Sequence, residues 1–339
     1  MIFKDATEIS LSGLKLNPFS IAWLFPHADL ARDPSNRLRR YQISRHLSGM
    51  PGLVTRCENF FFYDKKEYLR ENLLKFDIVV IFNINEYDLD LIKFLREKGK
   101  IVIFDHSENI FGLGCEDAVL ENVSAITCCS TALAENTQRY LKLRNIEKPI
   151  FVIRDPLDDD IFMSNRPYPN GYNTALIMGM GANVQYVLPV LEKYCRDTGY
   201  KIIILTEAGF SFPGHRVEFW TPYNWIEHAL GCSVALCYHS TAQFPAKGNV
   251  KVTTPMSIGL PVIAVPIQAY TEAIQTGYNG FVAFGETEWV AALNQLKDPG
   301  LRNLIGLRGR QSARSNYSTS KITLDYLSMI SYLITNKGS

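Results

Sequence analysis

The sequence, 339 residues long, has few features of metal-binding, secreted or membrane-spanning proteins. Its seven cysteines form no Cys-x-x-Cys pair and none stands near a histidine pair, which argues against a zinc site. The longest apolar runs, such as residues 78–82, have the length of a strand and fall far short of the roughly 20 residues of a transmembrane helix. Acidic residues interrupt the first segment, so no secretory signal is visible. These absences predict a protein of the reducing cytoplasm, with Cys128, Cys129, Cys232 and Cys237 as small buried hydrophobic residues.

An excess of charge is also missing, because 35 lysines and arginines stand against 34 aspartates and glutamates. This balance argues against a nucleic-acid-binding protein that works by bulk charge. A Gly-x-Ser-x-Gly elbow, a Walker loop and a Gly-x-Gly-x-x-Gly fingerprint are all absent, and Gly179-Met180-Gly181 lacks the third glycine. Dehydrogenase chemistry is therefore not favoured.

The pattern that is present alternates short β-branched runs with helical stretches. Most of the runs are continuously apolar, which is typical of strands covered on both faces. The predicted strands are residues 21–25, 78–82, 101–105, 125–129, 150–153, 174–178, 202–206, 217–220, 233–237, 262–265 and 281–283. The predicted helices include 87–98, 131–141, 184–196, 286–296 and 321–334. This order predicts the α/β class with parallel sheets and right-handed crossovers.

The two series of strands are separated by the turn-rich segment 165–171, which holds two prolines, two asparagines and a glycine. We therefore expect an N-terminal domain over 1–165, a second domain over 172–318, and a C-terminal helix within 319–339 that can pack back on the first domain. Each domain reads as a Rossmann-like, doubly wound parallel sheet. Ligands of such sheets lie outside the carboxyl ends of the strands, so two of them are expected to face each other across a cleft.

The most informative segment is 247–282. It reads as a helix with Lys247 and Lys251 near its start, ended by Gly259, followed by a buried strand and a second helix with Glu272 near its start. Backbone amides at a helix start, together with a lysine, can bind a diphosphate, and a carboxylate can accept the hydroxyls of a sugar. The alternative is an ordinary α/β unit with a solvated lysine face.

This segment resembles the donor-binding half of the retaining glycosyltransferases of family 4, which have the GT-B fold. The family pattern runs Lys-x-x-Glu-x-Met-Ala-x-Gly-x-Pro-Val-Ile, then Gly-x-x-Glu-Ile and Gly-x-Asn-Gly. The matching residues are Lys251, Met256, Gly259, Pro261, Val262, Ile263, Glu272, Gly277, Asn279 and Gly280. Weaker similarities lie at residues 35–39, 129–135, 152–158 and 176–182.

The sequence departs from the family at its Glu-x7-Glu motif, where Ala246 and Thr254 stand instead. The family's second glutamate holds the ribose hydroxyls of the nucleotide, and Thr254 can offer only one hydroxyl. The family's usual Arg-x4-Lys pair near the diphosphate cannot be identified clearly either. Lys247 and Lys251, one helical turn apart, are left to bind the diphosphate. The resemblance therefore implies a donor site that binds the ribose hydroxyls differently from the family.

Polar residues follow several predicted strands. In the first half, Asp105, His106 and Glu108 stand at a strand end, where the histidine could serve as a tuned base or clamp an acceptor hydroxyl, or belong to an ordinary polar loop. His27 suggests the same more weakly, and His239 follows the strand at 233–237. A cluster of arginines could meet a pyrophosphate-linked acceptor, an anionic lipid surface or water; its members are Arg32, Arg37, Arg39, Arg40 and Arg45.

A rival glycosyltransferase architecture uses an Asp-x-Asp motif to hold a metal ion on the nucleotide diphosphate. Two acidic segments of this sequence are candidates for that motif. Asp88-Leu89-Asp90 lies in a helical stretch, and Asp158-Asp159-Asp160 has no strand directly before it. Neither has the strand-end context of a hard-cation site, so no metal is expected.

The resemblance implies a metal-independent, retaining hexosyltransferase without a cofactor, which takes a UDP- or GDP-linked sugar. It implies a glycan, glycolipid or other hydroxyl acceptor, as in polysaccharide biosynthesis, and allows peripheral contact with the inner membrane face. The residues assigned to catalysis are His106, Lys251 and Glu272; those assigned to the donor are Gly179, Gly181, His239, Lys247 and Thr254; those on the acceptor side are Arg37, Asp105 and Glu108. The alternatives are a nucleotide-sugar epimerase or hydrolase of the same fold, and a non-catalytic module that binds a nucleotide sugar or a partner.

Overall fold

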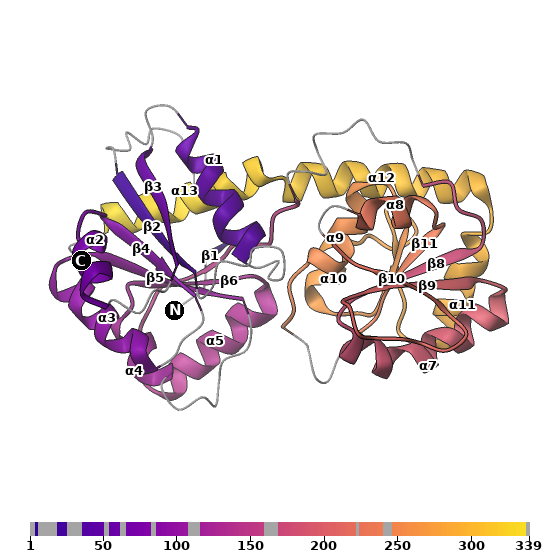
Figure 1. Cartoon of the computed structure of the whole chain (residues 1–339), viewed down its shortest axis with the longest axis horizontal. Coiled ribbons are helices and arrows are strands. Elements are labelled where there is room, and N and C mark those ends of the chain that lie inside the picture. Colours follow the sequence, from indigo (N-terminus) through magenta and orange to yellow (C-terminus); the bar gives the residue numbers. More distant parts are fainter. Residues whose placement is uncertain are drawn as a thin grey trace. The chain divides into compact units, whose positions relative to one another are not determined.

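A computed structural model describes residues 4–5, 19–25, 36–50, 54–61, 66–82, 86–107, 116–158, 169–221, 224–239 and 246–336. Internal contacts divide the chain into two compact units (Figure 1). The first consists of Met1–Pro156 with Thr319–Ser339, and the second of Leu157–Ser318. The division falls between Pro156 and Leu157, ahead of the turn-rich segment at 165–171.

The first unit contains a seven-stranded sheet with the order β1-β7-β6-β5-β4-β2-β3, and every neighbouring pair is parallel. The strands are β1 (Lys4–Asp5), β2 (Phe19–Phe25), β3 (Val54–Phe61), β4 (Ile78–Ile81), β5 (Ile101–His106), β6 (Ala125–Cys128) and β7 (Ile150–Val152). A π-helical segment, η2 (Asn36–Gln42), precedes α1 (Ile43–Ser48), and the other helices are α2 (Lys66–Leu73), α3 (Glu86–Glu97), α4 (Glu116–Asn122), α5 (Thr131–Leu143) and α13 (Thr319–Thr335).

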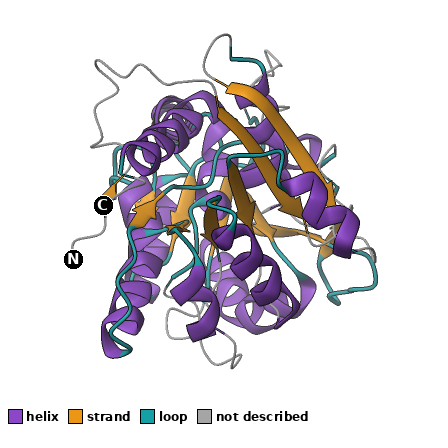
Figure 2. Cartoon of the chain, turned by 90° about the vertical axis from the view of Figure 1, so that its left-hand side faces the viewer, coloured by secondary structure: helices purple, strands orange, loops and turns teal. Residues whose placement is uncertain are grey.

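Helices cover both faces of this sheet (Figure 2). α1 and α13 lie on one face, and α3, α4 and α5 lie on the other (Figure 1). Alternate residues of a strand point to the same face, so Ile101 and Ile103 of β5 both enter the core beneath α13. In α13, Tyr326 is fully buried and its ring meets Trp23 of β2 edge to face at 5.4 Å. The last helix of the chain is thus part of the first unit's core.

The second unit contains a six-stranded parallel sheet with the order β10-β9-β8-β11-β12-β13. The strands are β8 (Thr174–Met178), β9 (Lys201–Thr206), β10 (Arg216–Phe219), β11 (Val234–Cys237), β12 (Val262–Ala264) and β13 (Phe281–Val282). The helices are α7 (Gly181–Thr198), α8 (Trp225–Leu230), α9 (Val250–Ser257), α10 (Gln268–Ala273), α11 (Glu286–Gln295) and α12 (Pro299–Tyr317). α7 and α11 lie on one face, and α8, α9 and α12 on the other (Figure 1).

The predicted α/β class with two parallel sheets is confirmed, and the eleven predicted strands are all present within one or two residues of their expected bounds. β1 and β3 were not predicted. β3 is the edge strand of its sheet, and polar residues interrupt its sequence, VTRCENFF, which is therefore not continuously apolar. The predicted burial of Cys128, Cys129, Cys232 and Cys237 is also confirmed. Within the described residues, no helix combines the length and apolarity that crossing a membrane requires.

Candidate functional site

The strand order of the second sheet marks one position on its carboxyl edge. The chain starts at β8 in the middle, builds outward through β9 and β10, and then returns to β11 on the other side of β8. The point between β8 and β11 is therefore a topological switch point, where the loops leaving two neighbouring strands diverge and a ligand can reach the strand ends. Gly179, Met180 and Gly181 follow β8, and Tyr238 and His239 follow β11.

Lys251 places its ammonium group at this switch point. It lies in the first turn of α9, and its Nζ is 3.4 Å from both the Tyr238 carbonyl oxygen and His239 Nε2. A Cβ added to Gly179 would lie 3.4 Å from the same Nζ, so the ammonium rests directly on the glycine after β8. The Cys237 thiol donates to the Lys251 carbonyl oxygen at 3.1 Å and fixes the backbone of this turn against β11. One cation thus joins the ends of the two central strands.

The electrostatic environment of Lys251 at the switch point disfavours further positive charge. Burial and the charge of Lys247 lower the pKa of Lys251. Burial, with the charges of Lys251 and Lys247, lowers the pKa of His239 from 6.5 to about 3. His239 is therefore neutral near pH 7, and its Nε2 can accept a hydrogen bond from the Lys251 ammonium when the ring proton is on Nδ1.

A pH dependence follows from the neutral state of His239. Between pH 6.5 and about 4.5 the unfolded chain protonates this histidine and the folded unit does not, so stability falls as the pH falls. We expect His239 alone to remove about 2 kcal/mol of the second unit's free energy of unfolding over this range. Urea unfolding of wild type and His239→Gln at both pH values measures it. A variant that loses as much stability as wild type would contradict the assignment.

The glycine loop after β8 holds a carboxylate that the sequence did not indicate. Glu207, the residue after β9, accepts the Gly181 amide at 3.1 and 2.9 Å through its two oxygens, and Thr206 Oγ1 donates to it at 2.8 Å. The Phe210 ring covers Gly181 so closely that an added Cβ would lie 2.1 Å from it. The Gly181 amide, expected to bind a diphosphate, is thus already bonded to Glu207 in this structure.

Glu207 takes the place of a side-chain cap at the start of α7, because the N-cap residue Met180 forms no side-chain hydrogen bond and Glu207 accepts the Gly181 amide. We expect Glu207→Ala to lower the free energy of unfolding of the second unit by about 1 kcal/mol, a typical value for loss of an N-cap. Glu207→Gln keeps an oxygen acceptor and should lose less. Chemical denaturation of both variants measures the difference, and an alanine variant as stable as wild type would remove the capping role.

The remaining predicted residues of the second unit lie in or near the helices that follow β11 and β12. The sequence predicts Lys247 and Lys251 one turn apart on the same helix. Lys247 instead precedes α9, which begins at Val250, so this prediction is wrong. Thr254 is half-buried, one turn along α9 from Lys251. Glu272 is exposed and lies in the last turn of α10 rather than near its start, after β12, the strand next to β11. Gly259 ends α9 with a φ of 88°, as a terminating glycine should.

At the carboxyl edge of the first sheet, Asp105 forms a buried ionic cluster. Arg39 Nη2 donates to it at 2.7 Å, Arg40 Nη2 lies 3.1 Å away, and Thr127 Oγ1 donates at 2.6 Å. Arg39 Nη1 also donates to the Ile153 carbonyl oxygen at 2.7 Å and to Asp155 at 2.9 Å. Burial would raise the pKa of Asp105, but the two arginines outweigh it and hold that pKa below its ordinary value.

The sequence left an acceptor, a lipid surface or water as what the arginine-rich segment meets, and for Arg39 and Arg40 these surface roles are wrong. Arg39 and Arg40 are completely buried, and the Arg40 guanidinium lies 3.2 Å from the centre of the Phe82 ring. Charges enter a protein interior when they are paired, and Asp105 and Asp155 together balance these two arginines. Arg37, also on η2, is half-buried, and Arg32 lies outside the described residues. The sequence showed the arginines but not their partners, which are distant along the chain.

His106 ends β5 on the face opposite Asp105. Its side chain is buried, its Nδ1 lies 3.1 Å from Thr137 Oγ1 of α5, and its ring stacks on Phe104 at 5.4 Å. Glu108 and His27 lie outside the described residues. The first unit therefore brings Arg37, Asp105 and His106 to one edge of its sheet, with Asp105 enclosed by arginines.

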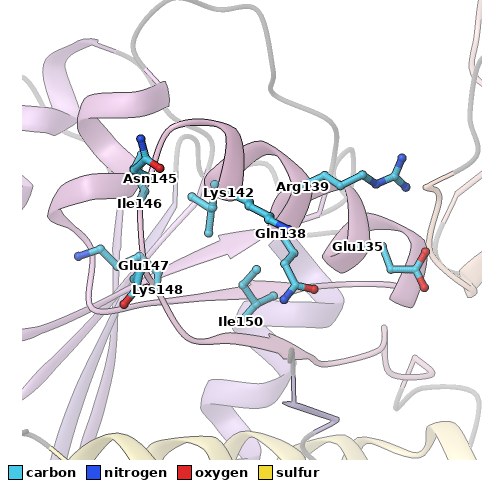
Figure 3. Close-up of a pocket in the computed structure, with 10 residues that line it drawn as sticks. Glu135, Gln138, Arg139, Lys142, Asn145, Ile146, Glu147, Lys148 and Ile150 are labelled. Carbon is cyan, nitrogen blue, oxygen red and sulfur yellow. The ribbon is translucent and has the colours of Figure 1, made fainter. Parts of the chain in front are cut away.

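A groove of about 700 Å³ lies elsewhere in the first unit, along α5 and the segment before β7 (Figure 3). Glu135, Arg139, Lys142 and Lys148 line it, so its charges are mixed. Its lining residues lie on α5 and in the segment that leads into β7, and Asp105 is not among them. Among the described residues, no group of three or more His, Cys, Asp or Glu is placed to hold a metal ion, and Asp90 of α3 is exposed.

No protein-family profile and no curated protein matches the sequence. Solved structures do match its fold. HepE from Anabaena, in complex with UDP and glucose, has a TM-score of 0.68 at 12% identity and covers 93% of this chain and 100% of its own. A glycosyltransferase from Rickettsia africae has a TM-score of 0.69 at 11% identity, covering 95% and 100%. Sucrose-phosphate synthase from Thermosynechococcus elongatus has a TM-score of 0.60 at 13% identity, covering 94% and 100%. These similarities give the chain the GT-B fold, with two Rossmann-like domains.

Proposed function

We propose that the protein is a glycosyltransferase that moves a hexosyl group from a nucleotide-activated donor to a hydroxyl of a glycan or glycolipid. The observation that carries the proposal is the Lys251 ammonium on Gly179, at the switch point between β8 and β11. The shared fold supports it, because structures with this fold include HepE in complex with UDP-glucose and the synthase of sucrose phosphate. A UDP- or GDP-linked sugar fits a single buried cation better than a neutral ligand does.

The chemistry requires stabilisation of a departing diphosphate. The bond between the anomeric carbon and the diphosphate oxygen breaks, and the nucleoside diphosphate leaves with the electron pair. An acceptor oxygen bonds to the carbon and gives its proton to the departing diphosphate oxygen. Lys251, supported by Lys247, would neutralise the charge that develops on the leaving group. Glu272 would hold donor hydroxyls, Thr254 would contact the ribose, and His106 with Arg37 would serve the acceptor side. Retention of the anomeric configuration is part of the proposal.

The test is incubation of the full chain with UDP-glucose and a panel of other UDP- and GDP-sugars, with and without oligosaccharide and glycolipid acceptors. Release of nucleoside diphosphate only with an acceptor supports the transferase. Release without an acceptor indicates a hydrolase, and conversion of the sugar without release indicates an epimerase. Binding without any turnover would replace the proposal with a non-catalytic module.

Because Lys251 supplies the charge that a metal supplies in other glycosyltransferases, we expect the activity to be metal-independent. An excess of EDTA should leave the rate of nucleoside diphosphate release within about twofold, since no metal–diphosphate complex has to form. The rate with and without EDTA, after removal of bound metals, measures this. A rate that requires Mn²⁺ or Mg²⁺ would contradict it.

A further inference from the structure

We propose that His239 is a positioning residue, whose imidazole accepts a hydrogen bond from Lys251 and holds the ammonium group on Gly179 for the donor diphosphate. This inference rests on the proposed function and deepens it, because it separates the group that meets the phosphates from the group that aims it. The sequence assigns His239 to donor binding, and the structure favours an indirect form of that role.

The geometry favours an action through Lys251. Within the described residues, the Lys251 ammonium has two polar contacts, the Tyr238 carbonyl and His239 Nε2, each at 3.4 Å. Both come from the two residues that follow β11, so they pull Nζ toward the switch point and away from the α9 backbone. An ammonium has three N–H donors, and these two contacts leave one for an anion.

The charge state of His239 fits the same role. A protonated imidazole could not accept from an ammonium and would repel both Lys251 and Lys247. Because burial and these two lysines keep the ring neutral, its Nε2 retains the lone pair that an acceptor needs. A carboxylate in this place would neutralise Lys251 and weaken its hold on a diphosphate, whereas a neutral acceptor orients the cation and leaves its charge intact.

Gly179 completes the arrangement. The Lys251 Nζ and Cε would lie 3.4 and 3.9 Å from a Cβ at this position, so the ammonium is in van der Waals contact with the place where a side chain would begin. The strand end after β8 is thereby covered by a cation whose direction is set from β11. The half-buried stem of Lys251 is held at its backbone by Cys237 and at its head by His239 and Tyr238.

A double-mutant cycle tests the role with UDP as the probe. His239→Ala should weaken UDP binding about three- to tenfold, the effect of losing one hydrogen bond that orients a charged group. His239→Gln keeps an oxygen acceptor and should bind within about twofold of wild type. In a Lys251→Met background, His239→Ala should cause no further loss, because the group that it positions is gone. His228→Ala, in the same unit but on α8, is the matched control.

Losses that add in the double variant would overturn the inference, because His239 would then contact UDP itself. Equal losses in His239→Gln and His239→Ala would also overturn it. A measurement without nucleotide keeps the test independent of the proposed function: the rate at which acetic anhydride modifies Lys251, followed by mass spectrometry. Release of the ammonium in His239→Ala should raise this rate at least about threefold, and an unchanged rate would overturn the inference. Failure of wild type to bind any nucleoside diphosphate would instead remove the proposed function.

Discussion

Asp105→Asn is expected to cost the first unit about 3–5 kcal/mol of its free energy of unfolding. The substitution keeps the volume of the side chain and removes its charge. Arg39 and Arg40 would then remain completely buried without the carboxylate that pairs with both of them, while Asp155 would keep its ion pair with Arg39. Breaking a buried ion pair from one side costs more than the pair contributes, because an uncompensated charge is left without water.

The measurement is hydrogen exchange of the β5 and β6 amides, with the amides of β11 in the second unit as an internal reference. Asp117→Asn is the matched control, since Asp117 pairs with Arg144 at 2.6 Å in the same unit but both side chains are substantially exposed. An exposed pair contributes at most about 1 kcal/mol, so the control should exchange nearly as wild type does. Similar exchange in the two variants would mean that Asp105 is not the counter-charge of this cluster.

Most strands could be predicted from the sequence because buried parallel strands have a distinctive residue pattern. Strands covered on both faces are continuously apolar, as in Ile78–Ile81 and Ile101–His106, and each was expected within a residue of its bounds. Val54–Phe61 lacked this signature because an edge strand is less enclosed. The order of the strands depends on pairing between distant segments, which local periodicity does not encode.

The candidate site was predictable only where one segment carries it. Lys251, Gly259 and Glu272 lie within a short stretch whose spacing resembles a known family, and Lys251 does lie at the switch point. The bonds of Glu207 to Gly181 and of Arg39 to Asp105 join residues 26 and 66 positions apart, so no local pattern announces them. The first bond joins the ends of the neighbouring strands β9 and β8, and the second joins η2, which follows β2, to β5, with β4 between those two strands. Only the strand order brings these segments together.

Lys251→Met is expected to weaken the binding of UDP by about 1.5–3 kcal/mol, the range for a hydrogen bond to a charged group, or roughly 10- to 150-fold. Methionine keeps the length of the stem and removes the ammonium that lies on Gly179. The diphosphate would then meet Lys247 alone. Calorimetry with UDP measures the loss, and uridine, which has no phosphate, should bind the variant and wild type alike.

The same substitution should not weaken the fold, and this contrast identifies the role of Lys251. Burial lowers its pKa, which means that the folded unit holds the charged form at a cost near pH 7. Removing the charge should therefore leave the free energy of unfolding equal or higher, while binding falls. Lys201→Ala is the control, because Lys201 is exposed and lies at the amino end of β9, whereas the switch point lies at the carboxyl edge of the sheet. This variant should change neither UDP binding nor the free energy of unfolding. A Lys251→Met variant that binds UDP as wild type does would show that the switch point is not the diphosphate site, whereas one that loses stability and binding together would make Lys251 a structural residue.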